Sequence, residues 1–204
     1  MYGLITTSLL LLFSFNSFSQ EIKKAEEQTK YLSVNLLPTI GTTIELGYEK
    51  NFIPQVSLSI YGGYTFSYNF ENYSQTQKIT EYLKNSGAFI KLETKITLRK
   101  DLNKIRPFIG FIVLNSLSIE ESKTTRTGNT ILYKTNEFNL GVVAVIGVTS
   151  SATKRLNVDL GLQFGTLLIN NLATKKSYLP GMGIDIFGNG YTTQGVLRVK
   201  YRIN

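Results

Sequence analysis

The side chains that could do chemistry in this chain are carboxylates and cations, because histidine and cysteine are both absent. Without cysteine we expect no disulfide, no thiolate nucleophile and no lipidated cysteine anchor. Without histidine the chain lacks the most common general base and the most common ligand of transition metals. Enzymes that modify lipids within a membrane usually combine a serine or carboxylate with a histidine base. The sequence therefore predicts no catalytic residue, no cofactor and no metal ion, and it argues against an enzyme.

The charged residues alternate with apolar residues in four segments: 43–49, 88–98, 156–164 and 197–203. Successive side chains of a β-strand point to opposite faces, whereas a helix would spread these charges around its surface. We therefore expect strands with one charged face and one apolar face. If the strands close into a barrel with the apolar face outward, the inward charges are Glu45, Glu49, Lys91, Glu93, Lys95, Asp159, Arg198 and Lys200.

The interior of an eight-stranded barrel is just wide enough for side chains to fill it. We interpret the inward charges as a structural, salt-bridged plug in which Asp159 faces Arg198 or Lys200. A narrow polar conduit, or a carboxylate held for catalysis, is the functional alternative. The spacing of the carboxylates does not single out a catalytic pair.

One further segment, Asp185–Gly190, has a faint similarity to a calcium-binding loop. It lacks the second acidic ligand and the distal glutamate that such a loop needs. We interpret it as a turn before the last strand.

The elements that must position these residues are about eight strands, each long enough to cross a bilayer at a tilt. After the first hairpin, short connections alternate with long ones near 69–86, 118–130 and 170–189. Outer-membrane barrels alternate in this way, with long loops outside the cell and tight turns in the periplasm. The expected strands are 30–38, 42–50, 54–68, 87–99, 106–117, 131–149, 153–169 and 190–203.

The N-terminus contains an apolar run from Leu4 to Phe15, which is too short to span a bilayer but fits the hydrophobic part of a signal peptide. Ser17 and Ser19 occupy the small-residue positions expected before a cleavage site, although no Lys or Arg precedes the apolar run. We expect residues 1–19 to be a signal peptide, 20–30 a polar periplasmic lead-in and 31–204 the barrel.

No later run of about 18 apolar residues follows, so a membrane-embedded form would have to be a closed barrel. The segments 34–38 and 41–49, with the Ser-Phe-Ser-Gln end of the signal, resemble small outer-membrane barrel proteins of Bacteroidetes-type bacteria. The resemblance implies a location in the bacterial cell outer membrane and a barrel fold, and no activity. The expected fold is all-β, an eight-stranded antiparallel up-and-down transmembrane β-barrel. A soluble lipocalin-like barrel is the alternative.

Two segments, 107–114 and 140–148, are apolar on both faces of their expected strands. One face would meet lipid, so the other must meet something apolar. The candidates are a dry cluster inside the barrel, a pocket for a hydrophobic ligand, or contact with another membrane protein. The sequence does not separate these three.

Aromatic residues continue the third expected strand into its loop. We expect part of this set to form the interfacial girdle, where amphipathic rings lie at the depth of the headgroups. An aromatic platform for carbohydrate or protein is the alternative. The set is Tyr61, Tyr64, Phe66, Tyr68, Phe70 and Tyr73.

The net charge of +8 falls at one end of the expected topology. The segments assigned to the periplasmic end carry ten basic residues and two acidic ones, Glu49 and Asp101, and ten minus two gives the whole excess. Contact with phospholipid headgroups explains such a rim best, and a negatively charged periplasmic partner is the alternative. Two of the ten basic residues, Arg198 and Lys200, are the inward charges named above. The other eight form the predicted periplasmic basic rim: Lys50, Arg99, Lys100, Lys104, Arg106, Lys154, Arg155 and Arg202.

These patterns predict a non-enzymatic outer-membrane barrel with a structural, adhesive or accessory-subunit role through its loops or wall. The alternative is a transport or binding barrel for a small, hydrophobic molecule. Expected partners are outer-membrane lipid and another outer-membrane or periplasmic protein. Nucleic acid is a poor partner for an exported protein.

Overall fold

The computed structural model describes residues 29–37, 42–74, 79–98, 105–126, 129–170, 178–185 and 191–203. The predicted signal peptide and all but the last two residues of the predicted lead-in lie outside these residues, so both stay predictions. The described residues contain no helix that is long and apolar enough to cross a membrane.

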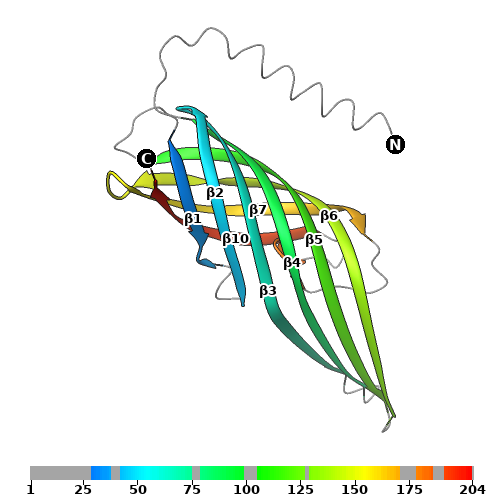
Figure 1. The fold of residues 1–204 in the computed structure, drawn as a ribbon. Coiled ribbons are helices and arrows are strands. Elements are labelled where there is room, and N and C mark those ends of the chain that lie inside the picture. Colours follow the sequence, from blue (N-terminus) through cyan, green and yellow to red (C-terminus); the bar gives the residue numbers. More distant parts are fainter. Residues whose placement is uncertain are drawn as a thin grey trace, which may run out of the picture.

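Eight of the ten strands in the described part of the chain form one closed antiparallel barrel (Figure 1). Each strand from β1 to β6 pairs with the next, β7 pairs with β10, and β10 pairs back with β1. The predicted eight-stranded antiparallel barrel is thereby confirmed. The barrel strands are β1 (Lys30–Asn35), β2 (Thr43–Ile53), β3 (Val56–Ser74), β4 (Ile79–Thr97), β5 (Arg106–Arg126), β6 (Asn129–Ser151), β7 (Leu156–Asn170) and β10 (Tyr191–Arg202).

The alternation of the sequence becomes an alternation between the inside and the outside of the barrel. From Phe89 to Thr97 on β4, every second residue is buried and the residues between them are exposed. The exposed positions carry large apolar side chains all around the wall, and the buried positions fill the interior. The outward set includes Leu46, Leu58, Ile90, Leu92, Phe111, Ile146, Leu160 and Phe164.

Two of the long loops predicted from the sequence are wrong. Residues 69–74 and 79–86 continue β3 and β4, and residues 118–126 and 129–130 continue β5 and β6. The alternation of apolar and polar residues fades in these segments. On β6, residues 130–136 are all exposed, so both faces of the strand meet solvent there and neither face needs apolar residues. The backbone ladder nevertheless continues, since it depends on main-chain hydrogen bonds.

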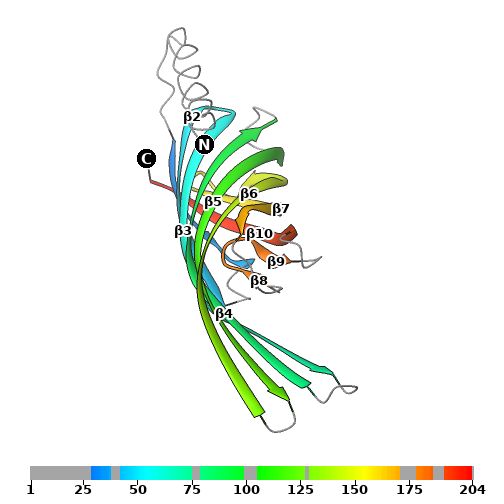
Figure 2. The same ribbon diagram turned by 90° about the vertical axis from the view of Figure 1, so that its right-hand side faces the viewer.

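These extensions form a four-stranded sheet that projects beyond the barrel, which we call the protruding sheet. β2 last pairs with β3 at Thr65, and β7 last pairs with β6 at Asn139; beyond these points only β3 to β6 continue. Figure 2 shows the four strands curving away from the barrel.

We call this end of the barrel the sheet end. The opposite end, with the short β2–β3 and β6–β7 turns, is the turn end.

The protruding sheet bends at its base, where the pairing of β3 with β4 shifts register between Thr65 and Tyr68. Such irregularities increase local twist and bend a strand. Gly87, opposite Thr65, allows β4 and β5 to approach closely: a Cβ at Gly87 would lie 2.2 Å from the carbonyl oxygen of Leu117. Any side chain at this position would push the two strands apart.

The third predicted long loop, near 170–189, contains two short strands that the sequence did not predict. β8 (Tyr178–Leu179) and β9 (Gly183–Asp185) form a small hairpin, and β9 pairs with Thr192 and Thr193 of β10. β1 pairs with β10 only from Arg198 to Arg202, so the hairpin takes up the edge of β10 that β1 leaves open. Its turn, residues 180–182, and Gly183 are buried inside the barrel.

Candidate functional site

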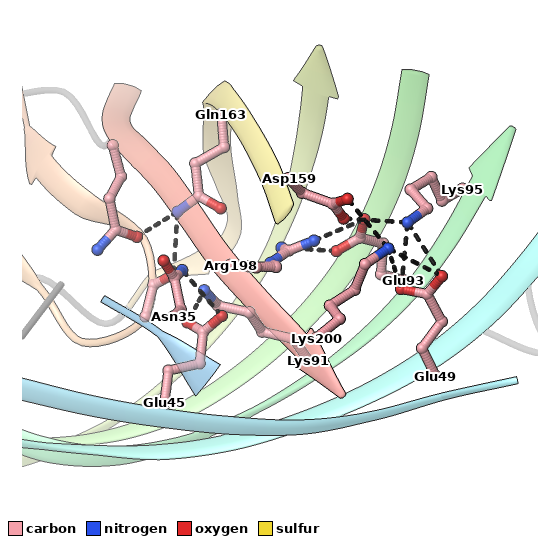
Figure 3. A network of polar contacts seen from close by, with 12 residues as sticks. Asn35, Glu45, Glu49, Lys91, Glu93, Lys95, Asp159, Gln163, Arg198 and Lys200 are labelled. Atoms are coloured by element: carbon pink, nitrogen blue, oxygen red, sulfur yellow. Dashed lines mark hydrogen bonds and ion pairs between the residues drawn. The ribbon is translucent and has the colours of Figure 1, made fainter. Parts of the chain in front are cut away.

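The eight inward charges predicted from the sequence lie together inside the barrel (Figure 3). They come from four strands: β2, β4, β7 and β10. Their spacing of two or four residues within a strand keeps them on one face. All eight are buried: Glu45, Glu49, Lys91, Glu93, Lys95, Asp159, Arg198 and Lys200.

Two of the ion pairs in this cluster are simple. Lys91 Nζ lies 2.5 Å from Glu45 Oε2, and the side-chain amide of Asn35 donates to the other oxygen of Glu45 at 3.2 Å. Arg198 approaches Glu93 with two nitrogens, at 2.7 Å and 3.0 Å. Such a two-point contact suits the planar guanidinium and fixes its orientation.

The other four charges form a closed ring. Lys95 lies 3.0 Å from both Glu49 and Asp159, and Lys200 lies 3.3 Å from Glu49 and 3.0 Å from Asp159. Each lysine therefore bridges both carboxylates. Four acidic and four basic side chains make the whole cluster neutral.

Each of the four cations of this cluster also lies over an aromatic ring, a feature that the sequence analysis missed. The attraction between a cation and the face of a ring strengthens when both are removed from water. The period of two could have indicated such pairs in the sequence, because it places Phe89 and Lys91 on the same face of β4. The pairs are Lys91 over Phe89 (5.0 Å to the ring centroid), Lys95 over Phe108 (5.3 Å), Arg198 over Tyr61 (4.3 Å) and Lys200 over Tyr31 (5.4 Å).

Tyr61 is therefore not part of an interfacial girdle, because its ring is 1% exposed and lies inside the barrel. Tyr64 and Phe66, its neighbours in the predicted aromatic set, are exposed on the outside and meet edge to face at 5.2 Å between centroids. The side chains of the later members, from Tyr68 to Tyr73, lie outside the described residues.

The ion-pair cluster has the chemistry of a structural network. Every one of its carboxylates contacts at least one cation of the cluster. Removing one partner from such a buried network leaves an uncompensated charge, which is strongly destabilising. In the described residues no three acidic side chains converge as a metal site would require. The calcium-like segment Asp185–Gly190 lies, after Asp185, outside the described residues.

A second cluster, on the β5–β6 side of the interior, is entirely apolar. Its residues come from β4, β5 and β6 and from the turn of the small hairpin. They pack against one another, so the inward faces of the two all-apolar segments meet a dry cluster. The members are Phe89, Phe108, Ile112, Leu114, Val143, Val145 and Met182, with Leu167 against them.

The hairpin turn enters this cluster through a gap left by glycines. A Cβ at Gly141 would lie 2.9 Å from Met182 Sδ, and a Cβ at Gly165 would lie 3.0 Å from Met182 Cε. Gly181 adopts a positive φ of 77° and lies against the Phe89 ring. Gln163, which hydrogen-bonds Gln194, also donates to the carbonyl of Gly181 at 3.4 Å.

The predicted basic rim is only partly a rim. Arg106 faces the interior and is buried. The alternation of β5 explains the error: its inward-facing positions begin at the first residue of the strand. Lys154 and Arg155 are exposed, Lys50 and Arg202 are half-buried, and Arg99, Lys100 and Lys104 lie outside the described residues.

Two of the rim cations contact aromatic side chains. Lys50 lies over the exposed ring of Phe52, 5.2 Å from its centroid, and Arg155 donates to the hydroxyl of Tyr201 at 3.3 Å. These contacts place positive charges beside aromatic rings at the turn end.

The protruding sheet exposes apolar residues on both faces. Ile131, Leu132 and Tyr133 are consecutive on β6 and all exposed. Glu121 on β5 contacts Lys134 at 3.1 Å and Lys84 at 3.7 Å. The hydrogen bond from Lys134 lowers the pKa of the Glu121 carboxyl, and the nearby positive charges act in the same direction.

Comparisons with known proteins concern the fold alone. No protein-family model matches the chain, and no curated protein matches it. Among solved structures, it is similar to the N-terminal β-barrel domain of Pseudomonas aeruginosa OprF, with 9% identity and a TM-score of 0.46 over 86% of this chain and 98% of that one. Neisserial surface protein A has 10% identity and a TM-score of 0.41, over 86% and 95%. Ail of Yersinia pestis, in complex with the heparin analogue sucrose octasulfate, has 9% identity and a TM-score of 0.38, over 87% and 99%.

Proposed function

We propose that this protein is a non-enzymatic barrel of the bacterial outer membrane that binds a protein partner through the free edge of its protruding sheet. The observation that carries the proposal is the edge of β6. Residues 129–136 pair with β5 on one side, and no described strand covers their other side. This edge includes Ile131, Leu132 and Tyr133, which are all exposed.

The membrane part of the proposal rests on the outer surface of the barrel. Large apolar side chains are exposed all around the wall, while the interior holds charges, an inversion that suits lipid outside and a filled interior. In a soluble barrel this surface would be an apolar patch far beyond the few hundred square ångströms that monomers usually expose.

The proposed orientation of the barrel follows from the different lengths of its two ends. The short turns would face the periplasm and the protruding sheet the outside of the cell. The exposed Lys154 and Arg155 would then contact phospholipid headgroups of the inner leaflet. Export by the predicted signal peptide (1–19) and an origin in Bacteroidetes-type bacteria belong to this proposal.

The partner that fits the β6 edge is a protein that contributes an extended segment. An uncovered edge presents unpaired main-chain donors and acceptors, and a second strand can add to them. Natural sheets usually protect such an edge with proline, a bulge or a covering element. Residues 129–138 contain no proline, and their pairing with β5 is regular.

Cell fractionation tests the membrane part. The protein should sediment with outer membranes and migrate faster on a denaturing gel when it is not heated, because a closed barrel resists the detergent. A soluble protein with a heat-insensitive band would contradict it.

Photo-crosslinking in the native cell tests the partner part. A crosslinking amino acid at Leu132 should yield a protein adduct of one defined size, and the same group at Thr94, an exposed position on the barrel wall, should not. Substitution of Tyr133 by lysine should abolish the adduct, whereas lysine at Thr124, on the central strand β5, should leave it. Equal adducts from Leu132 and Thr94, or none from Leu132 in a correctly fractionating protein, would contradict strand addition.

A further inference from the structure

Arg106 is a buried cation that does not belong to the ion-pair cluster. It is the first residue of β5, faces the interior and is 8% exposed. Its Nε has no hydrogen-bond partner, and no hydrogen bond or ion pair joins its guanidinium to another residue in the described part of the chain. A buried arginine usually has a partner, because water no longer compensates its charge. The position therefore favours an anion that the described residues do not supply.

The guanidinium of Arg106 is nevertheless within reach of a ligand. Nε is the only one of its three nitrogens that is both enclosed and unpartnered, so the two terminal nitrogens keep contact with the outside of the protein. Arg106 lies at the turn end, where β1, β5 and β7 begin and β10 ends. A ligand can therefore reach these nitrogens without any opening of the barrel.

Other hydrogen-bond donors lie near Arg106 at this end. Tyr31 on β1 and Asn157 on β7 are 9% and 7% exposed, and a hydrogen bond joins their side chains. Arg106 and Arg202 both lie close enough to the Tyr31 hydroxyl to act on its charge. Arg202, the last residue of β10, is half-buried. Two guanidiniums, a phenol and an amide thus gather from four strands, and all of them can donate to oxygen.

The ring of four charges lies farther into the barrel than this layer of donors. Tyr31 pairs with Glu49 across β1 and β2, and Asn157 pairs with Lys200 across β7 and β10. Lys200 lies over the Tyr31 ring and contacts Glu49 at 3.3 Å. The lysines of the ring are already neutralised, and its carboxylates repel a further anion. An anion that enters from the turn end therefore stops at Arg106.

The arrangement suits phosphate. A guanidinium presents parallel N–H donors that match two oxygens of a phosphate group. The donors come from different sides of the barrel, and a tetrahedral phosphate presents oxygens in several directions, whereas a carboxylate presents two oxygens in one plane.

We infer that the turn end of the interior is a phosphate-binding site with Arg106 as its principal ligand. Tyr31, Asn157 and Arg202 complete its donor set. The inference does not depend on whether the protruding sheet binds a protein. Under the proposed orientation the site opens to the periplasm.

The test uses the full chain folded in octyl glucoside, a detergent without phosphate, with inorganic phosphate as the probe. Phosphate should shift the Arg106 Nε–H resonance in a saturable way and raise the midpoint of thermal unfolding, because a ligand that binds only the folded state stabilises it. Sodium chloride at the same ionic strength should do neither. Arg106→Gln should weaken phosphate binding at least about tenfold, because it removes a charge-assisted two-point contact. Lys123→Gln, which removes an exposed cation from the same strand, should keep the wild-type affinity.

The stability of the variants without phosphate provides a second measurement. Arg106→Gln should then be at least as stable as the wild type, because glutamine removes a buried charge that lacks a partner. Lower stability would mean that the chain itself already compensates Arg106, and this would overturn the inference. Equal phosphate affinity in the wild type and in Arg106→Gln would overturn it as well. If Arg106→Gln does not fold, Arg106→Lys keeps the charge and loses the planar fork, and an unchanged affinity in that variant would contradict the site.

The phosphate group can come from solution or from a lipid headgroup, and a short-chain lipid separates the two sources. Dihexanoylphosphatidylglycerol, added below its micelle concentration, should bind more tightly than inorganic phosphate if the headgroup is the ligand. Tighter binding of inorganic phosphate would identify a soluble phosphate instead. In both cases the binding should weaken in Arg106→Gln, and a lipid or phosphate that binds this variant as tightly as the wild type would contradict the site.

Discussion

Glu49 on β2 and Asp159 on β7 share the same two cations, because Lys95 and Lys200 each lie within 3.3 Å of both carboxylates. β2 and β7 are not neighbours in the barrel, so this ring of four charges joins opposite parts of the wall across the interior. Its closure makes each member depend on the others.

Asp159→Asn should destabilise the barrel by about 3–5 kcal/mol, because it leaves Lys95 and Lys200 with only Glu49 between them in a buried site. Urea unfolding in lipid vesicles, followed by gel mobility, measures the change. Glu121→Gln, which removes a carboxylate from an exposed ion pair, should leave the unfolding midpoint unchanged. Equal changes in unfolding free energy for the two substitutions would show that the buried ring of charges contributes no more to stability than an exposed ion pair.

Arg198→Lys should cost about 1–3 kcal/mol although the charge is kept. Lysine cannot reproduce the two-point contact with Glu93, and it loses the planar stacking on Tyr61, whose centroid lies 4.3 Å from the guanidinium carbon. The same urea experiment applies, with Arg155→Lys at the exposed rim as the matched control. A neutral result for Arg198→Lys would mean that charge alone holds Glu93.

Gly87→Ala should destabilise the protein by about 1–3 kcal/mol and loosen the base of the protruding sheet, because the new methyl group would lie 2.2 Å from the carbonyl oxygen of Leu117. Gly62→Ala is the control, since a Cβ at Gly62 has no neighbour within 4 Å. Hydrogen exchange of the β4 and β5 amides beyond Gly87 reports the loosening. An unchanged exchange rate in Gly87→Ala would contradict the assigned close approach.

Leu92→Arg should cost about 2–4 kcal/mol in lipid vesicles, because Leu92 is an outward residue in the middle of β4 and its replacement would place a charge in hydrocarbon. Leu132→Arg, on the protruding sheet, should have no effect on unfolding, because that residue faces water under the proposed orientation. The comparison locates the membrane along the strands. Similar losses of unfolding free energy at both positions would mean that the bilayer also surrounds the protruding sheet. No loss at Leu92 would argue against a membrane location.

The barrel could be predicted from residues because its pattern is local. The apolar and charged residues of 43–49 and 88–98 alternate with the period of a strand, and one closed sheet satisfies all of them at once. The eight interior charges could be found in the same way. Their exact partners could not, since Lys95 meets Asp159 across the barrel from a sequence distance of 64 residues.

The structural predictions from the sequence are wrong where the local pattern of residue types does not reflect the surroundings of those residues in the fold. In the extension of β6, residues 130–136 are exposed on both faces, so they carry no alternation that marks a strand. Arg106 lies at the end of a strand, where one step of the pleat decides between the rim and the interior. Tyr61 has the composition of a girdle residue, and only the register of β3 turns it toward Arg198.

The sequence by itself determined the fold class, the charged interior and the lack of histidine and cysteine chemistry, because each follows from residue types and a period of two. The tertiary structure decided the ring between Glu49 and Asp159, the projection of the sheet and the burial of Met182. These depend on strands that are far apart in the chain. A turn such as 180–182 can enter a barrel only where glycines of distant strands, here Gly141 and Gly165, leave room for it.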